Sequence, residues 1–178
     1  MTAELRIRPA RTSDVSAIRA MVTPLAHQKI LLDKEAVAFY EAIQEFVVAE
    51  DASGTLLGFG ALHVMWEDLA EVRTLATAPE ARGRGVGSRI LGQLIERASR
   101  LGVDRIFCLT FETTFFASHG FEVMADQSTL DPEIFAELLR STDEGVAEFL
   151  DLARVKPNTL GNTRMILHLD RTNDHAQG

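Results

Sequence analysis

The sequence predicts one domain of the α/β (α+β) class: a mixed, mostly antiparallel twisted sheet of about six or seven strands flanked by helices. Consecutive strand-like segments joined by short turns indicate antiparallel neighbours, and an amphipathic helix between two strand-like segments indicates a parallel β-α-β unit. A chain of 178 residues with 46% hydrophobic content is long enough for one core and short for two. We therefore expect a single domain over residues 1–170 and a loose polar tail over residues 171–178.

The N-terminal segments predict a strand followed by two helices. Residues 5–8 alternate in polarity and end at Pro9, which is typical of a strand. Residues 12–14 offer N-cap oxygens for a helix that we expect Pro24 to close. A second helix is expected over residues 34–44. Its apolar residues at helical spacing are Val37, Tyr40 and Ile43.

The middle of the chain predicts an antiparallel meander. Residues 46–50, 56–64 and 69–76 are rich in strand-forming residues, and the turn signals at 51–54 and 66–68 separate them. An apolar stripe at helical spacing then predicts a helix over residues 86–101, followed by a buried strand over 105–109. The remaining expected elements are a short helix over 113–119, a strand over 121–123, a helical region over 131–152 and a last strand over 164–169 with Ile166 against the core.

The run Arg82-Gly83-Arg84-Gly85-Val86-Gly87 stands immediately before the long amphipathic helix. Glycines allow a tight turn and a close backbone approach, and unpaired N–H groups at a helix N-terminus attract phosphate. The run has no Gly-Lys-Ser/Thr ending, and its glycines alternate, so the patterns of triphosphatases and dinucleotide-binding proteins are absent. The pattern Arg-x-x-Gly-x-Gly remains and favours a pyrophosphate site. The alternative is a glycine-rich turn that merely joins a strand to a helix.

Charge and composition narrow the classes of partner. The formal net charge of −8 argues against binding to nucleic acid or to anionic membranes. No stretch approaches the ~20 apolar residues that span a bilayer. The single Cys108 excludes an internal disulfide and favours a core residue in a reducing compartment. The histidines show no metal-ligand spacing. We expect a cytoplasmic protein that binds no metal, nucleic acid or membrane.

The order of elements, with Arg82-x-x-Gly85-x-Gly87 and His119-Gly120-Phe121, resembles the N-acetyltransferases of the GNAT superfamily. Within it, the chain is similar to the short, kinase-less amino-acid N-acetyltransferases that make N-acetylglutamate at the start of arginine biosynthesis. This resemblance implies acetyl-CoA as the acetyl donor, L-glutamate or possibly L-glutamine as the acceptor, and a homodimer. The passages that carry it are Lys29–Leu32, Tyr40–Phe46, Gly60–Val64, Ala70–Ala76, Leu109–Thr113, Val155–Asn158 and Gly161–Met165.

The resemblance also implies a set of cofactor-binding residues. The backbone of the strand that enters the loop pairs with pantetheine in this superfamily, and an N–H group near Leu75 would suit the thioester oxygen in the transition state. Phe116 stands where many relatives carry a tyrosine that protonates the leaving thiolate, so that acid stays open, and Phe116 is expected to line the pantetheine tunnel or to pack. The expected cofactor residues are Leu75, Ala76, Thr77, Arg82, Gly83, Arg84, Gly85, Val86, Gly87, Ser88 and Phe116.

For catalysis, the resemblance implies Glu71 as the base that deprotonates the acceptor amine, directly or through a water. The alternative is a solvated strand-edge carboxylate or an ion-pair partner of Arg73. For the acceptor's carboxylates we expect cations, because the chain is acidic. The candidates are Lys34, Arg73, Lys156 and Arg164, for each of which a surface salt bridge is the alternative.

Other functions stay open from the sequence. The acceptor could be glutamine, another small amine, or a protein N-terminus or lysine. A domain that senses acetyl-CoA or an amino acid without turnover is the alternative outside enzymes.

Overall fold

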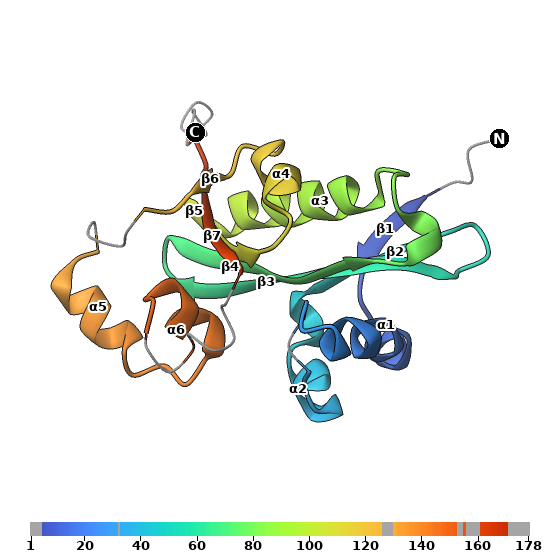
Figure 1. Ribbon diagram of the computed structural model, residues 1–178, viewed down its shortest axis with the longest axis horizontal. Helices are drawn as coiled ribbons and strands as arrows, with labels where there is room; N and C mark the ends of the chain where they lie inside the picture. Colours follow the sequence, from blue (N-terminus) through green and yellow to red (C-terminus); the bar gives the residue numbers. More distant parts are fainter. Residues whose placement is uncertain (1–4, 32, 126–129, 153–154, 156–160, 171–178) are drawn as a thin grey trace, which may run out of the picture. The chain divides into compact units, whose positions relative to one another are not determined.

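The computed structural model describes residues 5–31, 33–125, 130–152, 155 and 161–170. These residues form a seven-stranded sheet in the order β1-β2-β3-β4-β5-β7-β6, with flanking helices (Figure 1), which confirms the predicted fold class. The chain divides into two compact parts: the first part holds residues 1–63 and 72–97, and the second part holds residues 64–71 and 98–178. The strands are β1 Arg6–Pro9, β2 Phe46–Glu50, β3 Leu56–Trp66, β4 Leu69–Thr77, β5 Arg105–Thr110, β6 Glu122–Val123 and β7 Thr163–His168. The α-helices are α1 Val15–His27, α2 Ala36–Glu41, α3 Val86–Leu101, α4 Thr113–Ala117, α5 Pro132–Leu138 and α6 Glu144–Phe149, and short 3₁₀ turns are η1 Thr12–Asp14, η2 Ile43–Glu45 and η3 Pro79–Ala81.

In the first part, β2 pairs antiparallel with β3, as the meander predicts, and β1 pairs antiparallel with β2. Helices α1 and α2 lie on one face of these strands and α3 lies on the opposite face (Figure 1). Burying apolar side chains on both faces supplies the main driving force for this arrangement. The core cluster on the α1 and α2 face is formed by Val15, Ile18, Val22, Phe39, Phe46, Val48, Phe59, Ala61 and Ala76.

Two details of these helices differ from the prediction. Helix α1 continues through Pro24 to His27. Pro24 has no N–H group, so the Ala20 carbonyl has no donor within the helix. Ala20 and Pro24 are both exposed, so water can bind this carbonyl. Leu25 packs against the core cluster. Helix α2 is shorter than expected, and it buries Phe39 while Val37 and Tyr40 stay exposed.

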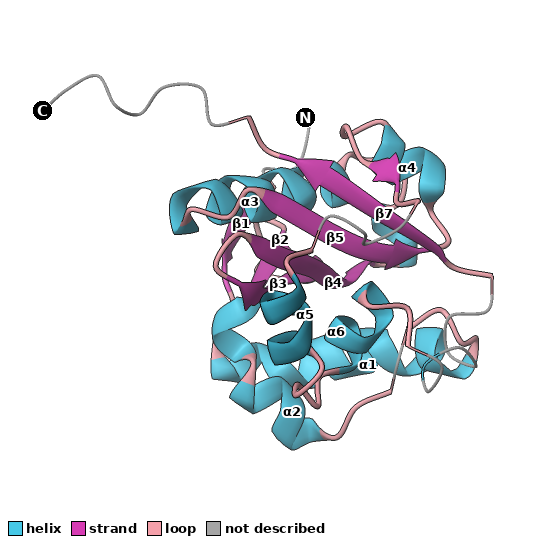
Figure 2. Ribbon diagram, turned by 90° about the vertical axis from the view of Figure 1, so that its left-hand side faces the viewer, coloured by secondary structure: helices cyan, strands magenta, loops and turns pink. Residues whose placement is uncertain are grey.

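In the second part, β4 and β5 are parallel, with Leu69 opposite Arg105 and Glu71 opposite Phe107. Strand β7 pairs antiparallel with β5 and carries the two-residue edge strand β6 (Figure 2). Met165 of β7 is buried, and Ile166, which pairs with the buried Phe107, is half-buried.

The predicted helical region over 131–152 is two helices in the structure. Asp131 accepts a hydrogen bond from the Glu133 amide and caps α5, and Asp143 accepts one from the Val146 amide and caps α6. Both helices pack on one face of the sheet in this part. Their core cluster contains Leu69, Phe107, Leu138, Val146, Phe149 and Leu150.

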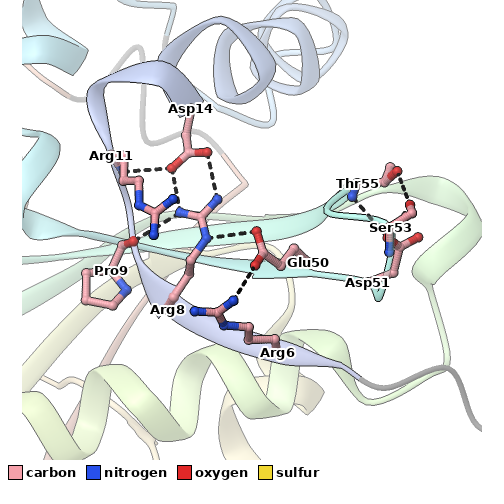
Figure 3. A network of polar contacts seen from close by, with 9 residues as sticks. All are labelled: Arg6, Arg8, Pro9, Arg11, Asp14, Glu50, Asp51, Ser53 and Thr55. Atoms are coloured by element: carbon pink, nitrogen blue, oxygen red, sulfur yellow. Dashed lines mark hydrogen bonds and ion pairs between the residues drawn. The ribbon is translucent and has the colours of Figure 1, made fainter.

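A network of charges around the buried Asp14 and Glu50 joins β1, β2 and the start of α1 (Figure 3). The Arg8 guanidinium donates to Glu50 Oε2 at 2.8 Å and to both carboxylate oxygens of Asp14, at 2.7 and 2.9 Å. The Arg11 amide donates to Asp14 Oδ2 at 2.7 Å, and Arg6 lies 3.5 Å from Glu50. Hydrogen bonds from Arg8 lower the pKa of Asp14, and this effect exceeds the opposing effect of burial.

We predict that Asp14→Asn destabilises the fold in a pH-dependent way. The Asp14 carboxylate has a folded-state pKa below its unfolded value of about 3.9, so its stabilisation is present above that pH and is lost as the pH falls through the folded-state pKa. At pH 7 the free energy of unfolding should fall by about 1.5 to 3 kcal/mol, the range for a hydrogen bond to a charged group. Urea unfolding at a series of pH values measures this.

The matched control is Asp33→Asn, at an exposed position before α2. It should leave the stability nearly unchanged. A loss in Asp14→Asn that stays constant as the pH falls below the range in which aspartate titrates would contradict the electrostatic explanation.

Candidate active site

The glycine loop is an exposed turn anchored at both ends. Ala81 and Val86 are buried, and residues 82–85 between them are exposed. Gly83 and Gly85 have φ angles of 72° and 74°, in the left-handed region that side chains with a Cβ rarely adopt. The loop leads directly into the 16-residue helix α3. Its glycines therefore hold the backbone in a conformation that presents N–H groups at a helix N-terminus, which suits an anion.

Positive charge gathers at this loop. Arg82 and Arg84 are exposed within the loop, and Arg89 is exposed in the first turns of α3. Hydrogen bonds from the Ser53 hydroxyl and the Thr55 amide lower the pKa of Asp51 in the β2–β3 turn, and the charge of Arg84 adds to that effect. In a chain of net charge −8, this is the local concentration of cations that a pyrophosphate would need.

The end of β4 precedes the loop and departs from a regular strand. Thr74 has a φ angle of 56°, which is rare for a β-branched residue and strained inside a strand. Ala76 beyond it is buried in the core cluster, and Leu75 and Thr77 are half-buried. Such a break reorients the backbone amides that follow it. The residues predicted to bind pantetheine thus lie directly after this break. No feature of the sequence indicated the break.

Glu71 is a buried carboxylate in the second part. Its side chain lies on β4 with the residue only 4% exposed, so the solvated strand-edge alternative was wrong. Burial raises the pKa of the neighbouring Cys108 thiol, and the charge of Glu71 raises it further. Cys108 is a buried core residue with little thiolate, which agrees with its predicted role. Glu71 as the catalytic base stays a prediction, and its burial beside Cys108 is compatible with a carboxylate that exchanges a proton with a substrate.

Arg164 on β7 has a structural contact as well as a free donor. Its guanidinium donates to the Phe149 carbonyl at the end of α6 and lies 3.8 Å from the Met124 sulfur. Its Nε is buried without a hydrogen-bond partner among the described residues. Burial lowers the pKa of Arg164, against the raising effect of the Asp151 charge. The side chain therefore caps a helix C-terminus and keeps one donor for a further acceptor.

The other expected substrate and tunnel residues are placed as follows. Lys34, just before α2, and Arg73 on β4 are half-buried in the first part. Lys156 lies outside the described residues. Phe116 on α4 is 5% exposed and packs edge-on against Phe121, with ring centroids 5.1 Å apart. Its side chain therefore contributes to the core of the second part.

The sequence analysis did not predict the pair that His63 on β3 forms with Glu45. The Nδ1 atom of His63 lies 2.7 Å from Glu45 Oε1, and both side chains are about one quarter exposed. His63 follows Ala61 by two residues, so it shares the face of β3 that α1 and α2 cover. Glu45 is 18 residues away, which is why no local pattern revealed the pair.

No group of three or more His, Cys, Asp or Glu side chains in the described ranges could hold a metal ion. Within the same part of the chain, no helix combines the length and the apolar character needed to cross a membrane.

Comparison with known proteins decides the family. The model of the acetyltransferase (GNAT) family matches residues 17–121, which is more than half of the chain. The chain belongs to the GNAT family of acetyltransferases. The seven-stranded mixed sheet with its parallel β4–β5 pair is the GNAT fold.

Named GNAT relatives include amino-acid acetyltransferases. The chain is 53% identical to the amino-acid acetyltransferase of Mycobacterium tuberculosis (strain ATCC 25618 / H37Rv) over 165 residues, which are 92% of this chain and 94% of that protein. It is 35% identical to the amino-acid acetyltransferase of Neisseria meningitidis (serogroup A) over 122 residues, which are 67% of this chain but 28% of that longer protein. The GNAT enzyme described here thus matches a short relative over almost its whole length.

Solved structures give the same result. The crystal structure of Rv2747 from Mycobacterium tuberculosis in complex with CoA and NLQ superposes with a TM-score of 0.88 at 52% identity, covering 93% of this chain and 99% of that one. N-acetylglutamate synthase from Neisseria gonorrhoeae, complexed with coenzyme A and N-acetyl-glutamate, superposes with a TM-score of 0.74 at 26% identity, covering 96% of this GNAT chain and 36% of that one.

Proposed function

We propose that this protein transfers the acetyl group of acetyl-CoA directly to the α-amine of L-glutamate and produces N-acetyl-L-glutamate. The observation that carries this proposal is the 53% identity to an amino-acid acetyltransferase over nearly the full length of both chains. The exposed loop with Gly83, Gly85 and two arginines supports acetyl-CoA as the donor, because it offers backbone N–H groups and cations to a pyrophosphate.

The proposed transfer is one step. The amine nitrogen forms a bond to the thioester carbonyl carbon while the C–S bond breaks, and the sulfur leaves as the thiolate of coenzyme A. Glu71 takes the ammonium proton, directly or through a water, before the attack. The second proton, which the nitrogen loses as the amide forms, passes through water to the thiolate. We propose that an N–H group near Leu75, just after the Thr74 break, stabilises the thioester carbonyl oxygen as negative charge develops on it.

Two points support glutamate as the acceptor: the cations available for its carboxylates and the similarity to a solved N-acetylglutamate synthase. A solved N-acetylglutamate synthase at 26% identity is bound to N-acetyl-glutamate, and the longer Neisseria relatives are named amino-acid acetyltransferases. Glutamate brings two carboxylates to an acidic chain, so dedicated cations are needed. We propose that Lys34, Arg73, Lys156 and Arg164 supply them.

The release of coenzyme A tests the acceptor. With glutamate, glutamine, aspartate and a lysine peptide assayed in parallel, we expect glutamate to give the highest kcat/KM. An amide in place of the side-chain carboxylate removes a charge that the cations would recognise. Absence of turnover with glutamate would overturn the proposal, and faster turnover of glutamine would move the preference to the amide.

We predict that Glu71→Gln lowers kcat by about 10² to 10⁴, the usual contribution of a positioned general base, without weakening CoA binding. Stopped assays give kcat, and calorimetry gives the Kd of CoA. Glu67→Gln, at an exposed position in the β3–β4 turn, is the matched control and should keep full activity. A Glu71→Gln protein with undiminished kcat would remove Glu71 as the base. A wild-type protein that binds CoA but turns over no amine would instead support a sensor.

The family resemblance alone supports three further proposals. We propose that the enzyme is a homodimer, that it works in the cytoplasm, and that it acts at the first step of arginine biosynthesis. A solved Neisseria gonorrhoeae synthase is complexed with coenzyme A and L-arginine, at 25% identity. Light scattering of the purified protein measures the proposed dimer.

A further inference from the structure

Two buried glycines on β3 face helix α3. A Cβ atom added to Gly58 would lie 2.9 Å from the carbonyl oxygen of Ala76 on β4 and 2.9 Å from Cδ1 of Ile90 on α3. A Cβ atom added to Gly60 would meet side-chain atoms, at 3.0 Å from Ile90 and from Leu75 and at 3.1 Å from Leu94. Both positions therefore set how closely α3 approaches the sheet. A backbone atom of β4 is among the three atoms nearest to the added Cβ at Gly58 but not at Gly60.

The backbone of β4 has two edges at this point. The Ala78 amide donates to the Leu57 carbonyl at 2.8 Å, and the Ala76 carbonyl also points toward β3. Because backbone groups of successive residues point to alternate edges of a strand, Leu75 and Thr77 direct their N–H and C=O groups to the other edge. That edge carries the groups of Leu75 and Thr77 that the family resemblance assigns to pantetheine.

We propose that Gly58 is a positioning residue for acetyl-CoA: its missing side chain lets the end of β4 and the start of α3 take the places in which they bind pantetheine and pyrophosphate. The inference rests on the proposed function, since it concerns the same donor site. It assigns a role in cofactor binding to a residue that touches no cofactor.

A backbone carbonyl and a side chain differ in how freely they can move away from an added methyl group. A backbone carbonyl cannot rotate away from a new methyl group without moving its strand, so an alanine at position 58 displaces Ala76 and, with it, Leu75 and Thr77. The same methyl group also meets Cδ1 of Ile90, the fifth residue of α3, so the packing of the helix start against β3 must readjust through that side-chain end. At position 60 all three nearest atoms belong to side chains, so no backbone carbonyl has to move.

The test compares Gly58→Ala with Gly60→Ala. Each adds one methyl group to the same face of β3, two residues apart. Calorimetric titration with CoA should give a Kd about tenfold higher in Gly58→Ala, the equivalent of overpacking by about 1.4 kcal/mol, and a Kd close to that of wild type in Gly60→Ala. Steady-state assays should show a raised KM for acetyl-CoA in Gly58→Ala and an unchanged KM for the acceptor.

A third variant separates positioning from stability. Gly58→Ala combined with Ile90→Val removes Cδ1, the α3 atom that the added Cβ meets, and keeps the contact with the Ala76 carbonyl. We expect it to melt no lower than Gly58→Ala while its affinity for CoA stays low. Equal losses of affinity in Gly58→Ala and Gly60→Ala, or full affinity in Gly58→Ala or in the double variant, would overturn the inference. Wild-type protein that fails to bind CoA would overturn the proposed function itself.

Discussion

The close approach of α3 to β3 is the constraint on which the first part of the structure depends. Because Gly58 and Gly60 have no side chains, Ile90 and Leu94 of α3 pack directly against β3. This spacing fixes the start of α3 relative to the end of β4 within the same part. The glycine loop joins these two elements, and its exposed backbone is therefore held between two buried anchors, Ala81 and Val86.

Charge is distributed in a way that suits an acidic enzyme with anionic substrates. The exposed cations of the glycine loop stand in a chain whose net charge is −8. Glu71 and the Nε atom of Arg164 are buried instead, where the lower dielectric strengthens every electrostatic interaction.

The elements with strong local patterns could be predicted from the sequence, and the long-range contacts could not. The apolar stripe of α3 and the glycine run gave the helix and its loop, because helical period and glycine conformation are local properties. The continuation of α1 through Pro24, the positive φ of Thr74 and the pair of His63 with Glu45 depend on tertiary surroundings. For the site, the loop and the burial of Cys108 were predicted, whereas the contact between Gly58 and the Ala76 carbonyl joins residues on different strands.

The proposed function requires that acetyl-CoA be held by backbone groups on two adjoining elements, the end of β4 and the glycine loop. Amide hydrogen exchange of the wild-type protein tests it most directly, with CoA, ADP and pantetheine added separately. We expect CoA to slow exchange at Leu75, at Thr77 and over residues 83–88, ADP to slow only the loop, and pantetheine only the strand. If CoA binds and these amides exchange as in the free protein, the account is wrong.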